Sequence, residues 1–180
     1  NLSFSLGKKP EPEIQKEIKR LVKAKKLIFA AASNTGGYGP RLWPAKEFGV
    51  FGVHATDEFA GVPNRINPSA KSNMDNFSTY GCDIESFWKG NYVSISGTSF
   101  ACPMAAAITA NILEFARHKL SEADAENFQR YGAVSQLLRR LVEIQARGHY
   151  HCLEPWVEGF WDGTVDDEHI QQICQILSEI

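Results

Sequence analysis

The sequence lacks several features that would assign its class at once. No uninterrupted apolar run reaches the roughly 18 residues of a membrane span, and no signal peptide is recognisable at its beginning. Neither sign of charge is in excess, since 19 Lys and Arg stand against 21 Asp and Glu, a net charge of −2. Such a balance gives no reason to expect nucleic acid or an anionic membrane as a partner. We therefore expect a globular protein with no nucleic-acid and no membrane partner.

Cysteine is scarce as well, and its arrangement excludes two common scaffolds. The spacings of the four cysteines fit neither a zinc site nor a dense disulfide framework; they are Cys82, Cys102, Cys152 and Cys174. This usage favours free thiols in a reducing, intracellular compartment. Internal repeats and low-complexity tracts are also absent. The 180 residues, 43% of them hydrophobic, suffice for one domain with a real core.

The chain does contain an alternation of strand and helix patterns. Residues 1–6 form a short apolar strand candidate, and residues 13–26 carry the stripe of an amphipathic helix. Residues 27–32 are a continuous apolar run, suited to a strand that is buried on both faces. A strand, a helix and a strand in this order predict a parallel α/β sheet. Residues 48–55 are predicted as a further strand, and residues 57–76 as a long surface loop.

The longest predicted helix covers residues 99–120. Its first half is apolar on all sides, so we expect it to be central and buried rather than amphipathic. Pro103 fits a helix only near its beginning, where a backbone N–H has no partner in any case. The helix should therefore begin close to Thr98 or Ser99. The Ser99 hydroxyl would then lie in the positive field of a helix N-terminus, which favours an oxyanion forming nearby.

The composition changes after residue 120. One amphipathic pattern lies between residues 128 and 142, and a second follows a capping-box pattern at Thr164 and Asp167. We expect residues 121–180 to form a mostly helical extension. Its apolar stripes need a surface to cover them, so the extension should pack on the flank of a domain formed by residues 1–120.

Four stretches resemble motifs of the subtilisin-like serine proteases, the subtilases, in the order in which that family has them. SGTSFACPMAAAI, which contains Ser99, resembles the nucleophile motif. LSFSLG resembles the strand that pairs with the substrate backbone, and IFAAASNTGG resembles the strand and loop of the oxyanion-hole asparagine. WPAKEFGVFGVHATD, followed by FSTYGCDI, resembles the connecting strand and the loop before the serine. The separation of Asn34 from Ser99 is also close to the family's usual one.

The resemblance covers residues 1–120 and implies an α/β fold with a three-layer parallel sheet of subtilisin type, present here in part. It implies a serine endopeptidase that hydrolyses protein or peptide substrates through an acyl-enzyme on Ser99. The Ser99 backbone N–H and the Asn34 side-chain amide would stabilise the negative charge of the tetrahedral intermediate. No cofactor and no metal ligand is implied, and a structural calcium ion is left open.

The same resemblance implies two substrate-binding stretches. One would pair with an extended substrate by strand addition, and its residues are Ser5, Leu6 and Gly7. The other would wall the primary specificity pocket, and its residues are Ala31, Ala32 and Ser33. Leu42 or Trp43 would close the far end of that pocket, which indicates an apolar substrate side chain.

The chain departs from the family in its triad. It has no Asp-Thr/Ser-Gly motif for the aspartate and no His-Gly-Thr motif for the histidine, both of which normally precede the strand with which this chain begins. His54 lies inside an apolar strand pattern, so we expect it in the core or on a sheet face. The other histidines follow Ser99, against the family order of Asp, His, Ser; they are His118, His149, His151 and His169.

A serine hydroxyl is a poor nucleophile without a base. We therefore expect this chain alone to be inactive, with the missing N-terminal half of the peptidase domain as its partner. The alternative is a non-catalytic, subtilase-like remnant or interaction module that keeps only the scaffold. The presence of both Ser99 and Asn34 favours the peptidase, because a scaffold has no packing need for both. Asp and His motifs encoded upstream of Asn1 would discriminate between the two.

Overall fold

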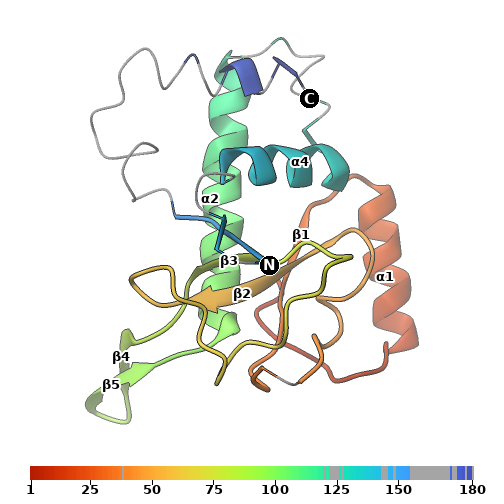
Figure 1. Ribbon diagram of the computed structural model, residues 1–180. Coiled ribbons are helices and arrows are strands. Elements are labelled where there is room, and N and C mark those ends of the chain that lie inside the picture. Colours follow the sequence, from red (N-terminus) through yellow and green to blue (C-terminus); the bar gives the residue numbers. More distant parts are fainter. Residues whose placement is uncertain are drawn as a thin grey trace.

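The structure is a computed structural model that describes residues 1–37, 39–119, 121, 126, 128–142, 146–147, 149–154, 171, 174–176 and 178–179. In this part of the chain a five-stranded sheet has helices on both faces (Figure 1). Its strands, in spatial order, are β1 (Ile28–Ala31), β2 (Val50–Thr56), β3 (Phe77–Tyr80), β7 (Tyr150–Cys152) and β6 (Ala146–Arg147). The pairs from β1 to β7 are parallel, and β6 pairs antiparallel with β7 at the edge. The predicted parallel α/β sheet is confirmed.

One face of the sheet is covered by α1 (Pro12–Lys23), which begins with a proline in its first turn. A proline is tolerated there because the first N–H groups of a helix have no intrahelical acceptor. The helix buries Ile18 against a small cluster that includes Ile28 on β1, Val50 on β2 and Trp43. The opposite face of α1 carries exposed Lys, Arg and Glu side chains, as the amphipathic pattern predicted.

The other face of the sheet carries the main core, beneath α2 (Thr98–Lys119) and α4 (Tyr131–Leu141). The phenylalanines of three neighbouring strands meet there, because alternate strand residues point to the same face. Phe29 stacks on Phe51 with ring centroids 4.7 Å apart, and Phe51 lies 5.8 Å from Phe77. Small residues on the inner side of α2, such as Ala101 and Ala105, let the helix approach this layer closely.

The expectation that α2 is buried on all sides is wrong for the described residues. Ala101, Cys102 and Ala105 are buried against the sheet, whereas Met104 and Ala107 on the opposite side are exposed. By length and composition α2 would also suffice to cross a bilayer, although no apolar run in the sequence had suggested a span. Because its inner face packs on the sheet, α2 is positioned here as a core helix with one side uncovered.

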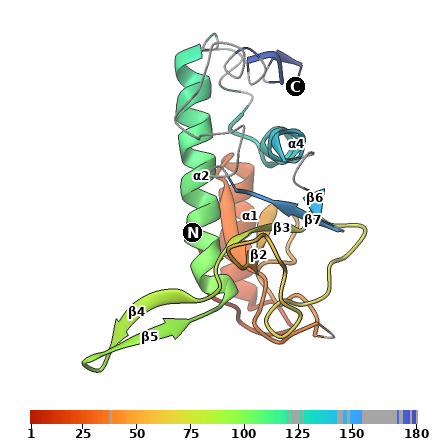
Figure 2. The ribbon, with the colours of Figure 1, turned by 60° about the vertical axis from the view of Figure 1, so that its left-hand side comes forward.

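Two strands lie outside the main sheet. β4 (Ile84–Trp88) and β5 (Asn91–Ile95) form an antiparallel hairpin that projects from the body beside the beginning of α2 (Figure 2). The N-terminal segment predicted as a strand makes only one isolated parallel bridge, between Leu2 and Ala30. The loop predicted for residues 57–76 is present between β2 and β3.

The C-terminal part differs from the mostly helical extension that we expected. It contributes α4, which packs on the main core, but also β7, which continues the sheet beside β3 with Phe77 opposite His151. The continuation is possible because β3 offers an unpaired parallel edge to any extended segment. The predicted boundary at residue 120 stays a prediction. The predicted helix after Thr164 lies largely outside the described residues.

Candidate active site

The beginning of α2 lies at the carboxyl edge of the sheet, where the loops that follow β1 and β3 meet. The Gly97 N–H donates to the Gly81 carbonyl at 2.8 Å, just after β3. The Ser33 N–H, just after β1, donates to Thr98 Oγ1 at 3.3 Å. Gly81 is required there, since a Cβ at this position would come within 2.9 Å of the Ala101 Cβ. The sheet thus fixes the start of α2 from two strands.

Asn34 is held against this helix start by Thr98. Its Oδ1 accepts the backbone N–H of Thr98 at 2.9 Å and the Thr98 Oγ1–H at 3.0 Å. The two bonds orient the amide, so that Nδ2 faces Gly97, where a Cβ would lie only 3.0 Å from it. Among the described residues, Nδ2 has no hydrogen-bond acceptor. Asn34 therefore presents a fixed, free N–H₂ donor at an exposed position.

Ser99 follows Thr98 in the first turn of α2 and is half-buried. The backbone N–H groups of a first helical turn have no intrahelical acceptor and lie at the positive end of the helix dipole. Pro103 lies four residues further along, inside the helix, and cannot donate to the Ser99 carbonyl. The structure brings Ser99 and Asn34 to one helix end, with the Ser99 hydroxyl beside the Ser99 backbone N–H and the Asn34 amide.

The N-terminal segment runs beside β1, and among the described residues the backbone groups of residues 3–5 have no backbone hydrogen-bond partner. Leu6 N–H donates to the Trp43 carbonyl at 2.8 Å, and the Gly7 carbonyl accepts the Trp43 N–H at 2.8 Å. Ser5 Oγ donates to the Ala31 carbonyl at 3.1 Å. In the part of the chain that the structure describes, the N–H and carbonyl of Ser5 pair with no backbone group. An extended peptide could pair with them by strand addition.

The predicted pocket wall is buried, with Ala31 at 1%, Ala32 at 0% and Ser33 at 1% exposure. Ser33 has a positive φ of 141°, and its Oγ lies 2.8 Å from Thr35 Oγ1. Trp43 does not close this pocket, because its side chain is fully buried beneath α1 and its Nε1 donates to Glu47 at 3.0 Å. Of the two residues expected at the far end, only the half-buried Leu42 remains available.

His54 is a core residue, as expected. It is fully buried on β2, and its Nε2 lies 2.9 Å from Arg41 Nη2. Burial, and secondly the charge of Arg41, hold the pKa of His54 well below its usual value.

His118 is exposed in the last turn of α2 beside Glu114, about 28 Å of helical rise from Ser99. His151 lies on β7, its ring against Phe77, and His169 is outside the described residues.

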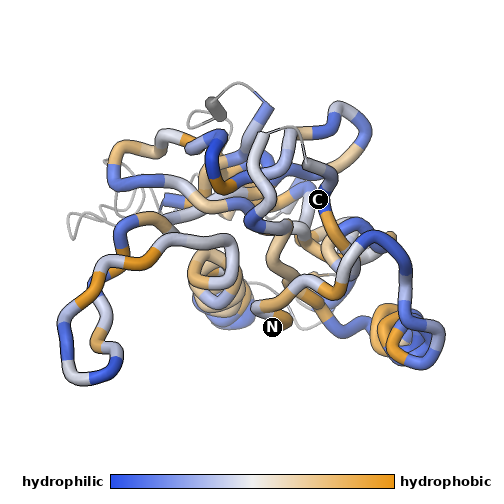
Figure 3. The backbone as a smooth tube through the Cα atoms, turned by 90° about the horizontal axis from the view of Figure 1, so that it is seen from below, coloured by the Kyte–Doolittle hydropathy of each residue, from blue (hydrophilic) through white to orange (hydrophobic). Residues whose placement is uncertain are grey.

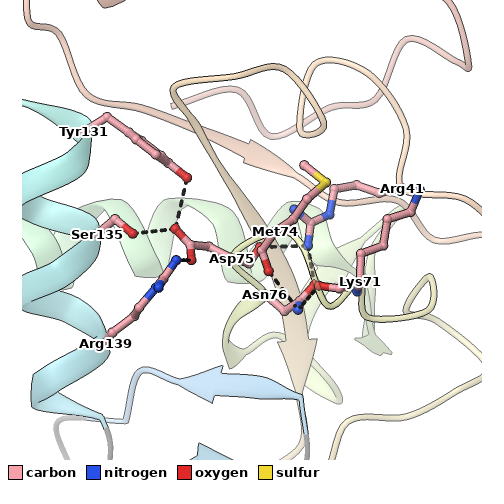
Figure 4. A network of polar contacts seen from close by, with 8 residues as sticks. All are labelled: Arg41, Lys71, Met74, Asp75, Asn76, Tyr131, Ser135 and Arg139. Carbon is pink, nitrogen blue, oxygen red and sulfur yellow. Dashed lines mark hydrogen bonds and ion pairs between the residues drawn. The ribbon is translucent and has the colours of Figure 1, made fainter.

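A separate polar network joins α4 to the sheet at the beginning of β3 (Figure 4). The buried Asp75 carboxylate accepts hydrogen bonds from Tyr131 Oη at 3.0 Å and from Ser135, and forms an ion pair with Arg139. The Asp75 backbone carbonyl accepts Arg41 Nη2 at 2.9 Å on the other side. Burial lowers the pKa of Arg41 to about 10 and raises that of Tyr131. Asp75 lies just before the beginning of β3, whereas Ser99 lies beyond the end of that strand. This network is therefore structural rather than part of the candidate site.

The family model that matches the chain is that of the subtilase family, over residues 1–148. The chain belongs to the subtilase family. This match extends beyond the residue 120 at which the resemblance was predicted to end. Subtilases are serine peptidases.

Two curated relatives are longer than this subtilase chain. Subtilisin-like protease het-Q2 of Podospora anserina is 27% identical over 184 residues, covering 91% of this chain and 48% of that protein. Thermostable alkaline protease of Halalkalibacterium halodurans is 37% identical over 94 residues, covering 47% of this chain and 22% of that protein. The subtilase chain therefore spans at most about half the length of these relatives.

Solved structures agree on the fold. The prenylagaramide maturation protease PagA matches with a TM-score of 0.66 at 20% identity, covering 85% of this chain and 56% of that chain. The patellamide maturation protease PatA matches with a TM-score of 0.62 at 23% identity, covering 78% and 50%. At these identities the likeness concerns the fold of the subtilase alone.

Sequence reasoning gave Thr98 no role in this subtilase, although it is the residue that joins Asn34 to the beginning of α2. The signal was its place between Gly97 and Ser99, since a threonine is favoured at a helix start because its hydroxyl makes hydrogen bonds there. Within the described ranges, no group of three or more His, Cys, Asp or Glu side chains could hold a metal ion.

Proposed function

We propose that this subtilase chain supplies the nucleophile and the oxyanion hole of a serine endopeptidase, and that its general base is contributed from outside the chain. Ser99 would be the nucleophile, and Asn34 with the Ser99 backbone N–H would form the oxyanion hole. The single observation that carries the proposal is the pair of hydrogen bonds from Thr98 to Asn34 Oδ1, at 2.9 and 3.0 Å. They leave Asn34 Nδ2 as a free, oriented donor beside the nucleophile.

In the proposed reaction, Ser99 Oγ attacks the carbonyl carbon of the scissile peptide bond while its proton passes to a base. The carbonyl oxygen becomes an oxyanion and accepts hydrogen bonds from the Ser99 N–H and from Asn34 Nδ2. Because both donors are already fixed, they need no reorganisation when the charge develops, which is the condition for effective electrostatic stabilisation. Collapse of the intermediate expels the amine with the proton from the base, and water then hydrolyses the acyl-enzyme.

We place the base outside this chain because the two histidines on β2 and α2 are engaged or distant. His54 is fully buried and contacts Arg41, so a charge on it would be desolvated and repelled. His118 stands at the other end of α2. We therefore propose the remaining part of a subtilase peptidase domain, carrying the triad aspartate and histidine, as the partner of this chain.

We propose a protein or peptide substrate that adds as a strand beside residues 5–7. The free backbone N–H and carbonyl of Ser5 support this assignment, since strand addition uses main-chain hydrogen bonds for affinity. The primary side chain of the substrate would lie against Ala31, Ala32 and Ser33, whose small size leaves room beside the strand.

The alternative is an interaction module that has kept the subtilase scaffold without catalysis. The uncovered outer side of α2 favours it, because an exposed apolar helix face is a binding surface in many proteins. The two functions differ in what they require of Ser99. Only the peptidase requires a reactive hydroxyl.

The discriminating experiment uses a fluorophosphonate probe, which labels a serine activated by a base. The purified chain alone should label no better than its Ser99→Ala variant. The same chain co-expressed with the polypeptide that its gene encodes directly before Asn1 should label at Ser99 and cleave an unfolded protein. Absence of Ser99-dependent labelling in a stable complex would refute the peptidase and leave the interaction module. Strong labelling of the chain alone would instead refute an external base.

A further inference from the structure

The charges of the chain are unevenly distributed along the sequence. Residues 8–26 contain eight Lys and Arg against three Glu, a local charge of +5, so the rest of the chain carries −7. Interactions between exposed charges are largely screened beyond about 10 Å at 0.1 M salt. Distant acidic residues therefore do not neutralise this segment. The net charge of −2, which gave no reason to expect an anionic membrane as a partner, conceals a strongly basic surface.

The helix α1 carries four of these cations on the side that faces away from the sheet, and two more lie in the turn that follows it. Positions three, four and seven residues apart share one side of a helix, and this side lies opposite the buried Ile18. In Figure 3, α1 lies at one edge of the molecule with hydrophilic residues on its outer side. All six cations are exposed, and together we call them the α1 basic face: Lys16, Lys19, Arg20, Lys23, Lys25 and Lys26.

Most cations of the α1 basic face have no anionic partner. Among the described residues only Arg20 forms an ion pair, with Glu17 at 2.7 Å. Lys19 and Lys23 are four residues apart on the helix, so two like charges lie side by side and repel each other. At the end of α2, by contrast, one glutamate pairs with two basic side chains. The α1 basic face therefore offers its lysine ammonium groups to an anion from outside the chain.

The turn after α1 has a lysine where a different residue is normally favoured. Lys25 has a φ of 56°, in the left-handed region that glycine adopts most easily at the end of a helix. A residue with a Cβ is strained in this conformation. Because Lys25 is exposed, burial does not offset that strain. What its side chain adds is a positive charge at the end of the α1 basic face.

The shape and composition of the α1 basic face favour a flat anionic surface over other polyanions. The face is the outer side of a helix, so it offers no free strand edge to which an acidic peptide could add. Residues 8–26 contain no aromatic residue on which a nucleic-acid base could stack. Five of the six cations are lysines, whose compact ammonium groups lack the two-point geometry with which arginine recognises single phosphates. Clusters of four to eight such cations on an amphipathic helix are attracted to anionic lipid.

The packing of α1 determines how it could contact a bilayer. Its apolar side is not available for insertion, because Ile18 packs against Ile28 and Val50. The contact would therefore be electrostatic and confined to the lipid headgroups. Burying the charged side beneath another part of the same domain would be costly, since its lysines are unpaired. Because α1 and α2 cover opposite faces of the sheet, a bilayer against α1 would leave Ser99 accessible.

We propose that the α1 basic face binds the anionic headgroups of a phospholipid bilayer, with the helix lying on the surface and not inserted. The partner is a surface of negative charge, recognised by the density of lysine ammonium groups. This inference goes beyond the proposed peptidase and does not depend on it, because it involves neither Ser99 nor a substrate.

The test is co-sedimentation of the full chain with two kinds of lipid vesicle at about 0.1 M NaCl. One kind is phosphatidylcholine alone, and the other contains about 30 mol% phosphatidylserine, an anionic lipid. The chain should bind the anionic vesicles about tenfold more tightly or better, and about 0.5 M NaCl should abolish this binding by screening. Equal binding to both vesicles, binding to neither, or binding that persists at high salt would overturn the proposal.

A matched pair of double variants locates the contact. Lys16→Gln with Lys23→Gln removes two charges from the α1 basic face and should weaken binding to anionic vesicles about 30-fold, since each cation near the surface contributes about fivefold. Lys71→Gln with Lys89→Gln removes the same charge from exposed positions in the loop after β2 and in the β4–β5 hairpin, and should leave binding unchanged. Glutamine is a good helix former, so α1 should stay intact, which circular dichroism verifies. Equal weakening by both double variants would overturn the proposal.

Two competitors decide between the classes of polyanion. Poly-glutamate and duplex DNA are each added to the vesicle-bound chain at the charge concentration of the lipid. Retention of the chain on the vesicles supports the bilayer. Displacement by poly-glutamate or by DNA would overturn the proposal and assign the face to an acidic protein or to nucleic acid. None of these measurements uses Ser99, so a failure of the proposed peptidase would leave their result unchanged.

Discussion

The two ends of α2 differ in almost every physical respect. At the N-terminal end Thr98 is 1% exposed, its side chain and backbone hold Asn34, and charge is absent for four turns. At the C-terminal end Glu114 pairs with the exposed side chains of Arg117 and His118. The difference teaches that a helix end can acquire chemistry where it is desolvated and where its free N–H groups lie beside a second, fixed donor. The opposite end is ordinary surface.

Of the substitutions at the two ends of α2, Ser99→Ala should cause the largest loss of activity. In the completed peptidase it removes the nucleophile, so kcat should fall by about 10⁶ and fluorophosphonate labelling should disappear. The half-buried position predicts little change in the melting temperature, measured by circular dichroism. A variant that kept labelling would move the nucleophile away from this helix end.

Asn34→Leu should have the second largest effect. It removes a single oxyanion donor, which costs about 10²–10³ in kcat, while KM should change little because the amide acts on the transition state. Steady-state kinetics on a peptide substrate separate the two parameters. A rise in KM at constant kcat would assign Asn34 to substrate binding instead.

Thr98→Val tests the positioning of Asn34 at the same end. The variant keeps the shape but loses one of the two hydrogen bonds to Oδ1, together with the bond that Thr98 Oγ1 accepts from the Ser33 N–H. We expect kcat to fall about tenfold. In an Asn34→Leu background the same change should cost much less, because the group that Thr98 positions is gone. Additive losses would mean that Thr98 acts independently of Asn34.

His54 is buried, whereas His118 is exposed, so His54 should contribute to the pH dependence of stability. Because burial lowers its folded pKa, His54 stays neutral below pH 6.5 while the unfolded chain takes up a proton. The free energy of unfolding should then fall as the pH drops below 6.5, by up to about 1.4 kcal/mol per pH unit. Urea unfolding from pH 7.5 to 5 measures this slope. The His54→Asn variant should show a weaker pH dependence of the free energy of unfolding. The remaining pH dependence would come from His151, whose pKa burial also lowers.

Glu114→Gln should have the smallest effect, at the other end of the comparison. It removes both ion pairs of the last turns, whose side chains are more than half exposed. Such surface pairs contribute less than about 0.5 kcal/mol, so neither stability nor labelling should change measurably. A loss comparable with that of Thr98→Val would show that the C-terminal end is more than surface.

Much of the core of this fold could be predicted from local pattern. The stripe through Ile18, the apolar run ending at Ala31 and the small residues around Ala105 each predicted the correct element, because periodicity reports which side of an element is buried. The pattern failed at Leu2, where a short apolar segment makes one bridge instead of a strand. It also failed at β7, because pairing with β3 depends on a free sheet edge and not on local propensity.

The residues of the candidate site also differ in whether the sequence could predict them. Ser99 and Asn34 could be recognised because their immediate neighbours form motifs, and the structure places both at one helix end. Thr98 as the link between them could not, because a hydrogen bond between residues 64 positions apart leaves no trace in local sequence. Trp43, one of two residues predicted to close the far end of the pocket, instead packs beneath α1 for a related reason. Its direction is set by packing against Ile18 and Ile28, not by its neighbours in sequence.

The sequence by itself therefore determined the strands and helices of the core, which residue is the nucleophile candidate and which family the chain resembles. These are properties of short stretches, fixed by periodicity, by capping and by motif spacing. Only the tertiary structure decided that Asn34 presents Nδ2, that His54 is sequestered by Arg41, and that one side of an all-apolar helix lacks cover. Those properties depend on which distant groups desolvate or hydrogen-bond one another, and burial is a property of the assembled chain.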